Sequence, residues 1–380
     1  MAAFLCLLAR GQDPIALSNL GTVRYQQGHY AEGESLYRQA VALWEKDGVE
    51  HADLAKGLSN LGALESALGR FAEAKTLFER ALAILNRVPG PVDTSEATTL
   101  NNLAEMYRVQ GKYAEAEPLL NRALRIRRKA LGEDHPDVGQ VWNNLGELYT
   151  AQGRYDEAEP ALRRALEIRQ AEPKPAHPEL AKCLSNLASL YRRQGRYAEA
   201  EPLFQQALRI REQSSTPKHP DVATGLNNLS QLYYVQGRQF EAEPLALRAL
   251  EIWEKAFSPE HPTVALGLNN LAGIYCAQYR YLAADPLYHR ALEIEEKTLG
   301  PDHPDVATTL NNLGAMYSQL GRYREAERLY RRALEIRKKA LGPQHPEVAA
   351  SIDNLSALRR IRSRAVKAPV TLHATADARR

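Results

Sequence analysis

The sequence is poor in cysteine, in long apolar runs and in charge of one sign. Three cysteines are scattered over 380 residues, at Cys6, Cys183 and Cys276, which argues against a disulfide framework and fits a reducing cytosol. No stretch approaches the roughly 20 consecutive apolar residues that a membrane-spanning helix needs. Lys and Arg number 49 against 46 Asp and Glu. We therefore expect a cytoplasmic protein without a membrane span.

The small positive charge is concentrated at the carboxyl end. Residues 359–380 contain seven Lys or Arg and one acid, so the preceding residues are slightly acidic. A nucleic-acid-binding surface needs clustered basic residues that neutralise phosphates, so we expect no nucleic-acid binding through that body. We expect residues 359–380 to be a basic, disordered tail. Residues 1–13 have a short apolar run without a preceding basic residue, and we expect an N-terminal capping segment instead of a secretory signal.

What the sequence does contain is a regular repeat. The pattern Leu-x-Asn-Leu-Gly/Ala recurs with one interval of 41 residues and seven of 42. A fixed period of this length indicates stacked units instead of one closed core. The asparagine that precedes the second leucine, here called the ladder asparagine, falls at Asn19, Asn60, Asn102, Asn144, Asn186, Asn228, Asn270, Asn312 and Asn354.

Each unit is predicted to be a pair of helices, as residues 303–342 illustrate. His303-Pro304-Asp305 is typical of a helix start, because proline is tolerated in the first turn and an acid complements the positive helix end. The first helix (helix A) carries leucines at helical spacing and is predicted to end at Gly321 in a left-handed cap. A second amphipathic helix (helix B) is expected from about Tyr323 to Ala340. Small residues recur where the two helices would meet.

These motifs resemble the tetratricopeptide repeat. The order Leu-x-x-Leu-Gly/Ala-x-x-Tyr, then Gly-x-Tyr, then Ala-Glu-x-x-Leu/Tyr-x-x-Ala-Leu matches that family, and the Leu-Asn-Asn-Leu core and Leu-Gly-x-x-His-Pro-Asp-Val-Ala connector are similar to its kinesin-light-chain-like branch. The resemblance covers residues 14–358. It implies an all-α, right-handed α-solenoid of eight hairpins plus a terminal ninth helix A, whose A helices line a concave peptide-binding groove. No heptad region precedes the repeats, so we expect a stand-alone scaffold and not a motor subunit.

The ladder asparagines have two interpretations. They fall on the side of helix A opposite its packing leucines, so packing inside one hairpin does not explain them. In the structural interpretation, each amide bonds to the backbone of the neighbouring repeat. In the functional one, the amides contact the main chain of an extended guest peptide, since an amide offers both a donor and an acceptor; asparagine does so in related tetratricopeptide grooves.

Selectivity is expected from helix A positions that vary, mainly three and six residues after the ladder asparagine. The third to sixth repeats are charged or aromatic there, and we expect the primary site in them, with Arg108, Lys182 and Arg192 receiving an acidic group of the partner. The alternative is an ordinary solvated helix face. The predicted peptide-binding residues are Asn102, Glu105, Arg108, Asn144, Glu147, Lys182, Asn186, Arg192, Asn228, Gln231, Tyr234, Asn270 and Asn312.

Two motifs that resemble chemical sites are better explained otherwise. Six His-Pro pairs recur at the repeat period, about 10 Å apart by helix-packing distances, whereas metal ligands lie about 2 Å from one shared ion. Residues 69–76 end like a phosphate-binding loop, but Ala74 occupies the place of the required glycine. We expect no catalytic residue, no metal and no cofactor.

The sequence therefore predicts a non-catalytic scaffold for protein–protein interaction. Its expected partner is a protein or peptide held as an extended segment against the A helices. The alternative is a regulatory or sensor subunit that acts with an effector carried on a separate chain. Fold alone does not decide between them.

Overall fold

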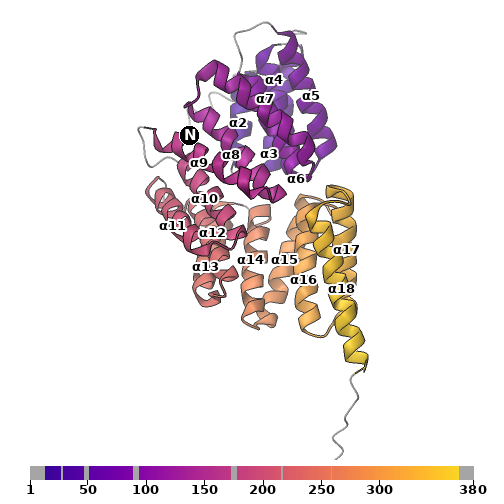
Figure 1. Ribbon diagram of the computed structural model, residues 1–380. Coiled ribbons are helices and arrows are strands. Elements are labelled where there is room, and N and C mark those ends of the chain that lie inside the picture. The colour runs from indigo at the N-terminus through magenta and orange to yellow at the C-terminus, as the bar shows by residue number, and fades with distance from the viewer. Residues whose placement is uncertain are drawn as a thin grey trace, which may run out of the picture. The chain divides into compact units, whose positions relative to one another are not determined.

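The computed structural model describes residues 13–26, 29–46, 51–88, 94–172, 178–214, 217–257 and 259–367. These residues form seventeen helices and no strand (Figure 1). The helices are α2 (Pro14–Gln26), α3 (Tyr30–Lys46), α4 (Ala52–Ala67), α5 (Phe71–Arg87), α6 (Thr94–Val109), α7 (Tyr113–Leu131), α8 (Pro136–Gln152), α9 (Tyr155–Gln170), α10 (Pro178–Arg193), α11 (Tyr197–Ser214), α12 (Pro220–Val235), α13 (Gln239–Ala256), α14 (Pro262–Ala277), α15 (Tyr281–Thr298), α16 (Pro304–Gln319), α17 (Tyr323–Leu341) and α18 (Pro346–Lys367). None of them is long and apolar enough to cross a membrane.

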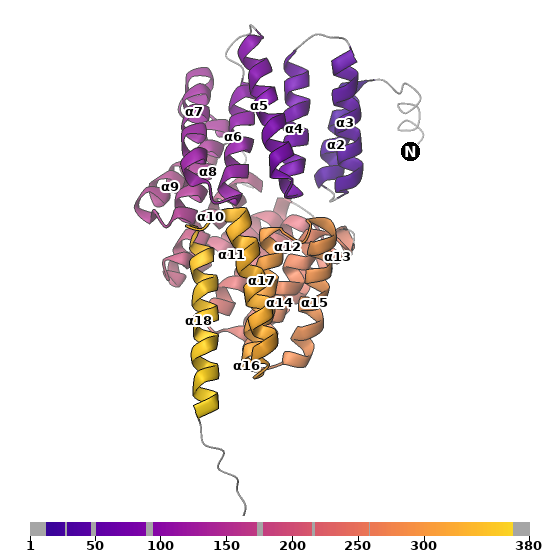
Figure 2. The same ribbon diagram turned by 90° about the vertical axis from the view of Figure 1, so that its right-hand side faces the viewer.

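Consecutive helices pack as antiparallel hairpins, which Figure 2 shows most plainly for α2 to α5. Even-numbered helices are the A helices and odd-numbered helices are the B helices. The chain divides after Pro301 into two compact units. The first unit contains repeats 1 to 7 (α2/α3 to α14/α15), and the second contains repeat 8 (α16/α17) followed by α18. The predicted all-α solenoid of helical hairpins is confirmed.

The structure describes only part of the two terminal segments expected from the sequence. The first described helix begins at Pro14, one residue after the expected capping segment. The last helix continues to Lys367, past the expected end of the repeats at residue 358. Residues 1–12 and 368–380 lie outside the described residues, and so do most of the segments for which a cap and a disordered tail were expected.

Within the first unit the A helices are packed more closely to one another than the B helices are. Each A helix contacts its own B helix, the preceding B helix and the next A helix, whereas no comparable contact joins successive B helices in the described part of the chain. Glycines on helix A permit the closest approaches. A Cβ atom added at Gly146 would lie 2.4 Å from Cγ of Leu162, and one added at Gly57 would lie 2.4 Å from the Trp44 ring.

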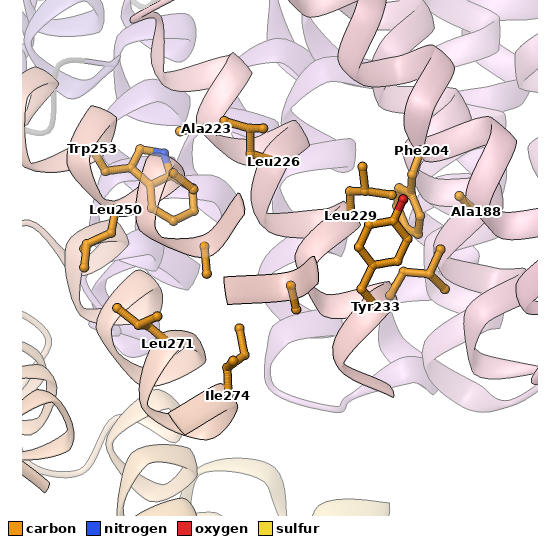
Figure 3. Close-up of a cluster of buried hydrophobic side chains, with 14 of the residues drawn as sticks. Ala188, Phe204, Ala223, Leu226, Leu229, Tyr233, Leu250, Trp253, Leu271 and Ile274 are labelled. Atoms are coloured by element: carbon orange, nitrogen blue, oxygen red, sulfur yellow. The ribbon is translucent and has the colours of Figure 1, made fainter. Parts of the chain in front are cut away.

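One apolar cluster spans repeats 4 to 7 of the first unit. Figure 3 shows part of it, where Phe204, Leu226, Trp253 and Ile274 come from four successive helices, α11 to α14. Trp253 is 2% exposed and Leu226 is 1% exposed. Each A helix is therefore buried on two sides, against its own hairpin and against the neighbour. Stability in such an array comes from nearest-neighbour interfaces.

The helix ends follow the repeat motifs. The Nδ1 atom of His135 accepts a hydrogen bond from the backbone N–H of Asp137, 3.1 Å away, and His219, His261, His303 and His345 cap their helices in the same way. The interpretation of His-Pro as a helix start is thus confirmed at five of six positions; His177 lies outside the described residues. Gly321 has the expected left-handed conformation, with φ +75°.

An arginine at the start of helix B makes a second recurring contact between neighbouring repeats. In repeat 5, Arg196 stacks 3.9 Å above the Tyr191 ring and pairs with Glu199 and, 2.8 Å away, with Glu159 of repeat 4. Burial would raise the pKa of Glu159, but hydrogen bonds from Arg196 and Arg163 lower it to about 2. Arg154 and Arg238 make the same contacts in repeats 4 and 6.

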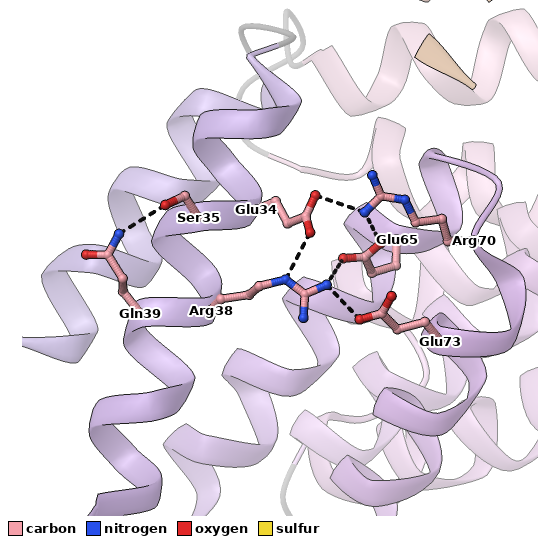
Figure 4. Close-up of polar contacts among 7 residues, drawn as sticks. All are labelled: Glu34, Ser35, Arg38, Gln39, Glu65, Arg70 and Glu73. Carbon is pink, nitrogen blue, oxygen red and sulfur yellow. Dashed lines mark hydrogen bonds and ion pairs between the residues drawn. The ribbon is translucent and has the colours of Figure 1, made fainter. Parts of the chain in front are cut away.

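Repeat 2 replaces the tyrosine of this arrangement with Glu65. Glu65 is fully buried, and Figure 4 shows it between two arginines, with Arg38 2.8 Å and Arg70 2.9 Å away. Arg70 also bonds to Glu34 of repeat 1. Burial and Glu34 raise the pKa of Glu65, against the attraction of Arg70. An ion-pair network therefore takes over the role that cation–π stacking has in later repeats.

Candidate functional site

The thirteen predicted binding residues all lie on A helices. Twelve belong to the first unit and Asn312, on α16, belongs to the second. Asn228 and Gln231 are half-buried on α12. The remaining residues are distributed over α6 (Asn102, Glu105, Arg108), α8 (Asn144, Glu147), α10 (Lys182, Asn186, Arg192), α12 (Tyr234) and α14 (Asn270).

The ladder asparagines bond across repeats, side chain to side chain. The Nδ2 atom of Asn186 donates to Oδ1 of Asn143 at 2.9 Å, and Asn144, Asn270 and Asn354 make the same bond to Asn101, Asn227 and Asn311. Asn102 instead donates to the Ser59 hydroxyl at 3.4 Å. These bonds correspond to the inter-repeat alternative, except that the acceptor is a side chain of the preceding repeat and not its backbone. Guest contacts by the same amides remain a prediction.

Four of the predicted charged residues lie close together on α6, α8 and α10 and have no net charge. They are Glu105, Arg108, Glu147 and Lys182. Arg108 is bonded in bidentate fashion by Glu105, at 2.7 and 2.5 Å. Burial raises the pKa of Glu147, Lys182 and Arg108 act to lower it, and Glu105 acts to raise it. Two acids and two bases thus meet here. Glu105 engages Nε and Nη2 of Arg108, so only the remaining N–H groups of this guanidinium are left for a guest acid.

Arg192 is separate from this cluster, at the opposite end of α10 from Lys182. Its half-buried guanidinium has no acid within salt-bridge distance among the described residues. Burial, together with the neighbouring Arg193, lowers its pKa. A positive charge held in this way would gain from an incoming anion. The three cations that were expected to share one acidic group are therefore divided between two places.

A further group of polar side chains lies around Gly273, three residues after the ladder asparagine of repeat 7. A Cβ atom added to Gly273 would meet only the hydroxyl oxygens of Tyr288 and Tyr234, at 3.7 and 3.9 Å. Burial raises the pKa of the Cys276 thiol to about 11, although a hydrogen bond with Tyr288 acts to lower it. Sequence reasoning singled out Tyr234 alone. It missed Tyr288 because that residue lies on a B helix.

The first unit also contains a contact between distant parts of the chain. The rings of Tyr30 in repeat 1 and His261 at the start of repeat 7 have centroids 5.2 Å apart, and a cavity of about 310 Å³ lies beside them, lined also by His29 and Glu260. Phe257 stacks on His261 with a centroid distance of 4.3 Å. Nothing in the repeat pattern predicted this contact, because it joins residues that are six repeats apart. None of the predicted binding residues lines this cavity.

Two protein-family models match this chain. The family model described as tetratricopeptide repeat matches residues 12–87, 95–171, 137–213, 179–255, 221–278 and 263–339, and a second model of that description matches residues 59–130. No curated protein matches the chain closely enough to count as a relative.

Several solved structures are similar to this chain. BtubC (BKLC) from P. vanneervenii is 28% identical over 63% of this chain and 94% of its own, with a TM-score of 0.48. A kinesin light chain-related protein from P. anserina with nearly identical tetratricopeptide-like repeats is 27% identical over 54% of this chain and 97% of its own, with a TM-score of 0.44. A Rap protein in complex with competence and sporulation factor is 14% identical over 92% of this chain and 99% of its own, with a TM-score of 0.58. At that identity the likeness to the Rap protein shows the fold alone.

Proposed function

The chain belongs to the tetratricopeptide repeat family, and we propose that it is a non-catalytic cytoplasmic scaffold that binds an extended segment of a partner protein along its A helices. The observation that carries this proposal is the row of ladder amides. Asn270, for example, uses one N–H for Asn227 and keeps a carbonyl oxygen and a second N–H. Where such groups stay free on several A helices, they can bond to the N–H and C=O groups of an extended main chain. Asn144 is an exception, because it is buried and both sides of its amide are already bonded.

Arg192 is the proposed place for an acidic side chain of the guest. Its guanidinium is half-buried and lacks an acid partner among the residues that the structure describes, whereas Arg108 is bonded by Glu105. Hydrogen bonds from arginine to a carboxylate are charge-assisted and directional. Arg108 and Lys182 are proposed as secondary contacts, because the nearby carboxylates of Glu105 and Glu147 repel a guest acid there.

The test starts with dodecapeptides selected from a random displayed library on the immobilised full chain. Their affinities are measured by fluorescence anisotropy for the wild type and for Arg192→Glu. We expect acidic peptides to be enriched and Arg192→Glu to weaken them about tenfold or more, the range of a lost charge-assisted hydrogen bond.

Arg193→Glu is the matched control, because Arg193 is adjacent, exposed and of equal charge. It should change affinity little. Equal losses in both variants would indicate a long-range charge effect and contradict the assignment to Arg192. A library that yields no binding peptide would contradict the proposed function itself.

A further inference from the structure

Gly273 is a helix glycine that local packing does not explain. The other described glycines of the A helices are closely packed, since a Cβ atom added at any of them would lie 2.4–3.1 Å from a neighbouring atom. At Gly273 the nearest atoms are 3.7 and 3.9 Å away, and the residue has no positive φ. Glycine in a helix interior costs about 0.5–1 kcal/mol relative to alanine. The fold would therefore accept a larger residue here.

In repeat 1 the position equivalent to Gly273 carries a side chain. Its equivalent of Gly273 is Thr22, and its equivalent of Tyr288 is Tyr37. The hydroxyl groups of Thr22 and Tyr37 are 2.9 Å apart and hydrogen-bonded. In repeat 7 the threonine is missing, and the Tyr288 hydroxyl bonds to the thiol of Cys276, which is a weak hydrogen-bonding partner.

Two hydroxyl groups consequently face the space above Gly273. Tyr288 comes from α15 of the same repeat and Tyr234 comes from α12 of the preceding one. Burial raises the pKa of both phenols and of Cys276, so all three groups are uncharged at neutral pH. A neutral ligand group suits this place better than a carboxylate does, because Asp285 is near enough to help raise the pKa of Cys276 and would repel a second carboxylate.

We propose that a main-chain peptide group of the guest packs against Gly273, beside the hydroxyl groups of Tyr234 and Tyr288. This inference rests on the proposed function and names the point where the guest backbone comes closest to the scaffold. The missing side chain permits the close approach of a second backbone. The Tyr234 hydroxyl donates to a guest carbonyl oxygen. Asn270, one turn earlier on the same helix, offers its Oδ1 atom to a guest N–H.

The test introduces at Gly273 the threonine that repeat 1 has at the equivalent position, Thr22. Gly273→Thr in the full chain should place a hydroxyl beside Tyr288 without disturbing the fold, which circular dichroism melting checks. Binding of the library-selected dodecapeptides should weaken at least tenfold, because the guest backbone is pushed away. Tyr234→Phe should weaken the same peptides several-fold without adding bulk. Ala315→Thr is the matched control, since Ala315 occupies the equivalent position of repeat 8 but is not a glycine, and it should change affinity less than twofold.

The peptide provides the second half of the test. N-methylation of one guest amide should reproduce the loss caused by Gly273→Thr, and it should add little further loss when Gly273→Thr is the host. If truncation of a guest side chain reproduces the loss instead, a side chain occupies the space and the main-chain assignment is wrong. Unchanged binding to Gly273→Thr, or an equal loss with Ala315→Thr, would overturn the inference while the proposed function stands. If Gly273→Thr melts early, Tyr234→Phe alone decides, and unchanged affinity in that variant overturns the inference.

Discussion

The amides of Asn144 and Asn101 join two neighbouring repeats: Nδ2 of Asn144 donates to Oδ1 of Asn101 at 2.6 Å. Both side chains are buried, Asn144 with 8% and Asn101 with 7% exposed. The same bond joins Asn186 to Asn143 and Asn270 to Asn227 in the first unit, and Asn354 to Asn311 in the second. It is the direct physical link between the most regular sequence feature of the chain and the stacking of its hairpins.

Replacing Asn144 should therefore destabilise the array. Asn144→Ala leaves the buried Oδ1 of Asn101 without this donor, and we expect a loss of about 1–3 kcal/mol in the free energy of unfolding, measured by urea denaturation. Asn228→Ala is the control, because the residue opposite it is Ser185, whose hydroxyl bonds to the backbone of Ala181 instead. Equal stabilities of Asn144→Ala and the wild type would contradict the stabilising role of this bond.

The arginine at the start of helix B, which pairs with the preceding repeat, gives a second stability prediction. Arg154 stacks on Tyr149 at 4.3 Å and pairs with Glu117 of the preceding repeat. Arg154→Lys keeps the charge and loses the planar stacking, so we expect about 1 kcal/mol of destabilisation, the usual value for cation–π contacts that are partly exposed. Tyr149→Phe keeps the ring and should cost less. Thermal and urea unfolding of the two variants give the comparison, and the opposite order would contradict the stacking role.

Glycine should be required at Gly146 but not at Gly273. Gly146→Ala places a methyl group 2.4 Å from Leu162 Cγ, and overpacking of this kind costs about 1–3 kcal/mol. Gly273→Ala meets no atom closer than 3.7 Å and should stabilise the chain by up to about 1 kcal/mol. Urea denaturation of both variants is the measurement. Destabilisation by Gly273→Ala would mean that this glycine has a packing role after all.

Acid should weaken the contact of His261 with repeat 1. Burial and the nearby His29 lower the pKa of His261 to about 4, whereas histidine in an unfolded chain titrates near 6.5. The unfolded state therefore binds the proton more readily, and the stability that neutral His261 contributes is present above pH 6.5 and lost as the pH falls toward 4. Between pH 7 and pH 5 we expect a loss on the order of 2 kcal/mol.

His261→Asn is the matched variant for this titration. Asparagine keeps an acceptor for the backbone N–H of Thr263, as helix caps require, but it does not titrate. Carboxylates such as Glu159 titrate equally in both proteins, so the difference between their pH–stability curves isolates His261. Parallel curves between pH 7 and pH 5 would contradict the assignment.

Local and repeated features could be predicted from the sequence, and contacts between distant repeats could not. The 42-residue period predicted the hairpins, the His303 type of helix start and the Gly321 cap, since each depends on a few neighbouring residues. The partner of Asn144 depends on how two repeats are aligned, which the period alone leaves open. The contact of Tyr30 with His261 depends on the summed rotation of six repeats, to which every small difference in packing contributes.

The same distinction applies to the candidate site: the positions of its residues could be predicted, but their bonding partners could not. Its positions on the A helices follow from helical periodicity, but the state of each group depends on partners. Arg108 and Arg192 occupy the same place in repeats 3 and 5, yet Glu105 precedes only the first of them, where Ser189 stands in repeat 5. In the sequence Gly273 is only a small residue at a variable position. That no close neighbour requires glycine there depends on the packing of α12 and α15, which no sequence pattern records.

Hydrogen–deuterium exchange of the full chain, with and without a saturating library-selected dodecapeptide, tests the central claim most directly. If the A helices hold the guest, exchange should slow in segments covering Lys182–Arg192, Asn228–Tyr234 and Asn270–Cys276, with little change in the B helices of the same repeats. Protection confined to B helices, or to the basic residues after Leu358, would show that the guest binds elsewhere and that the A helices serve packing alone.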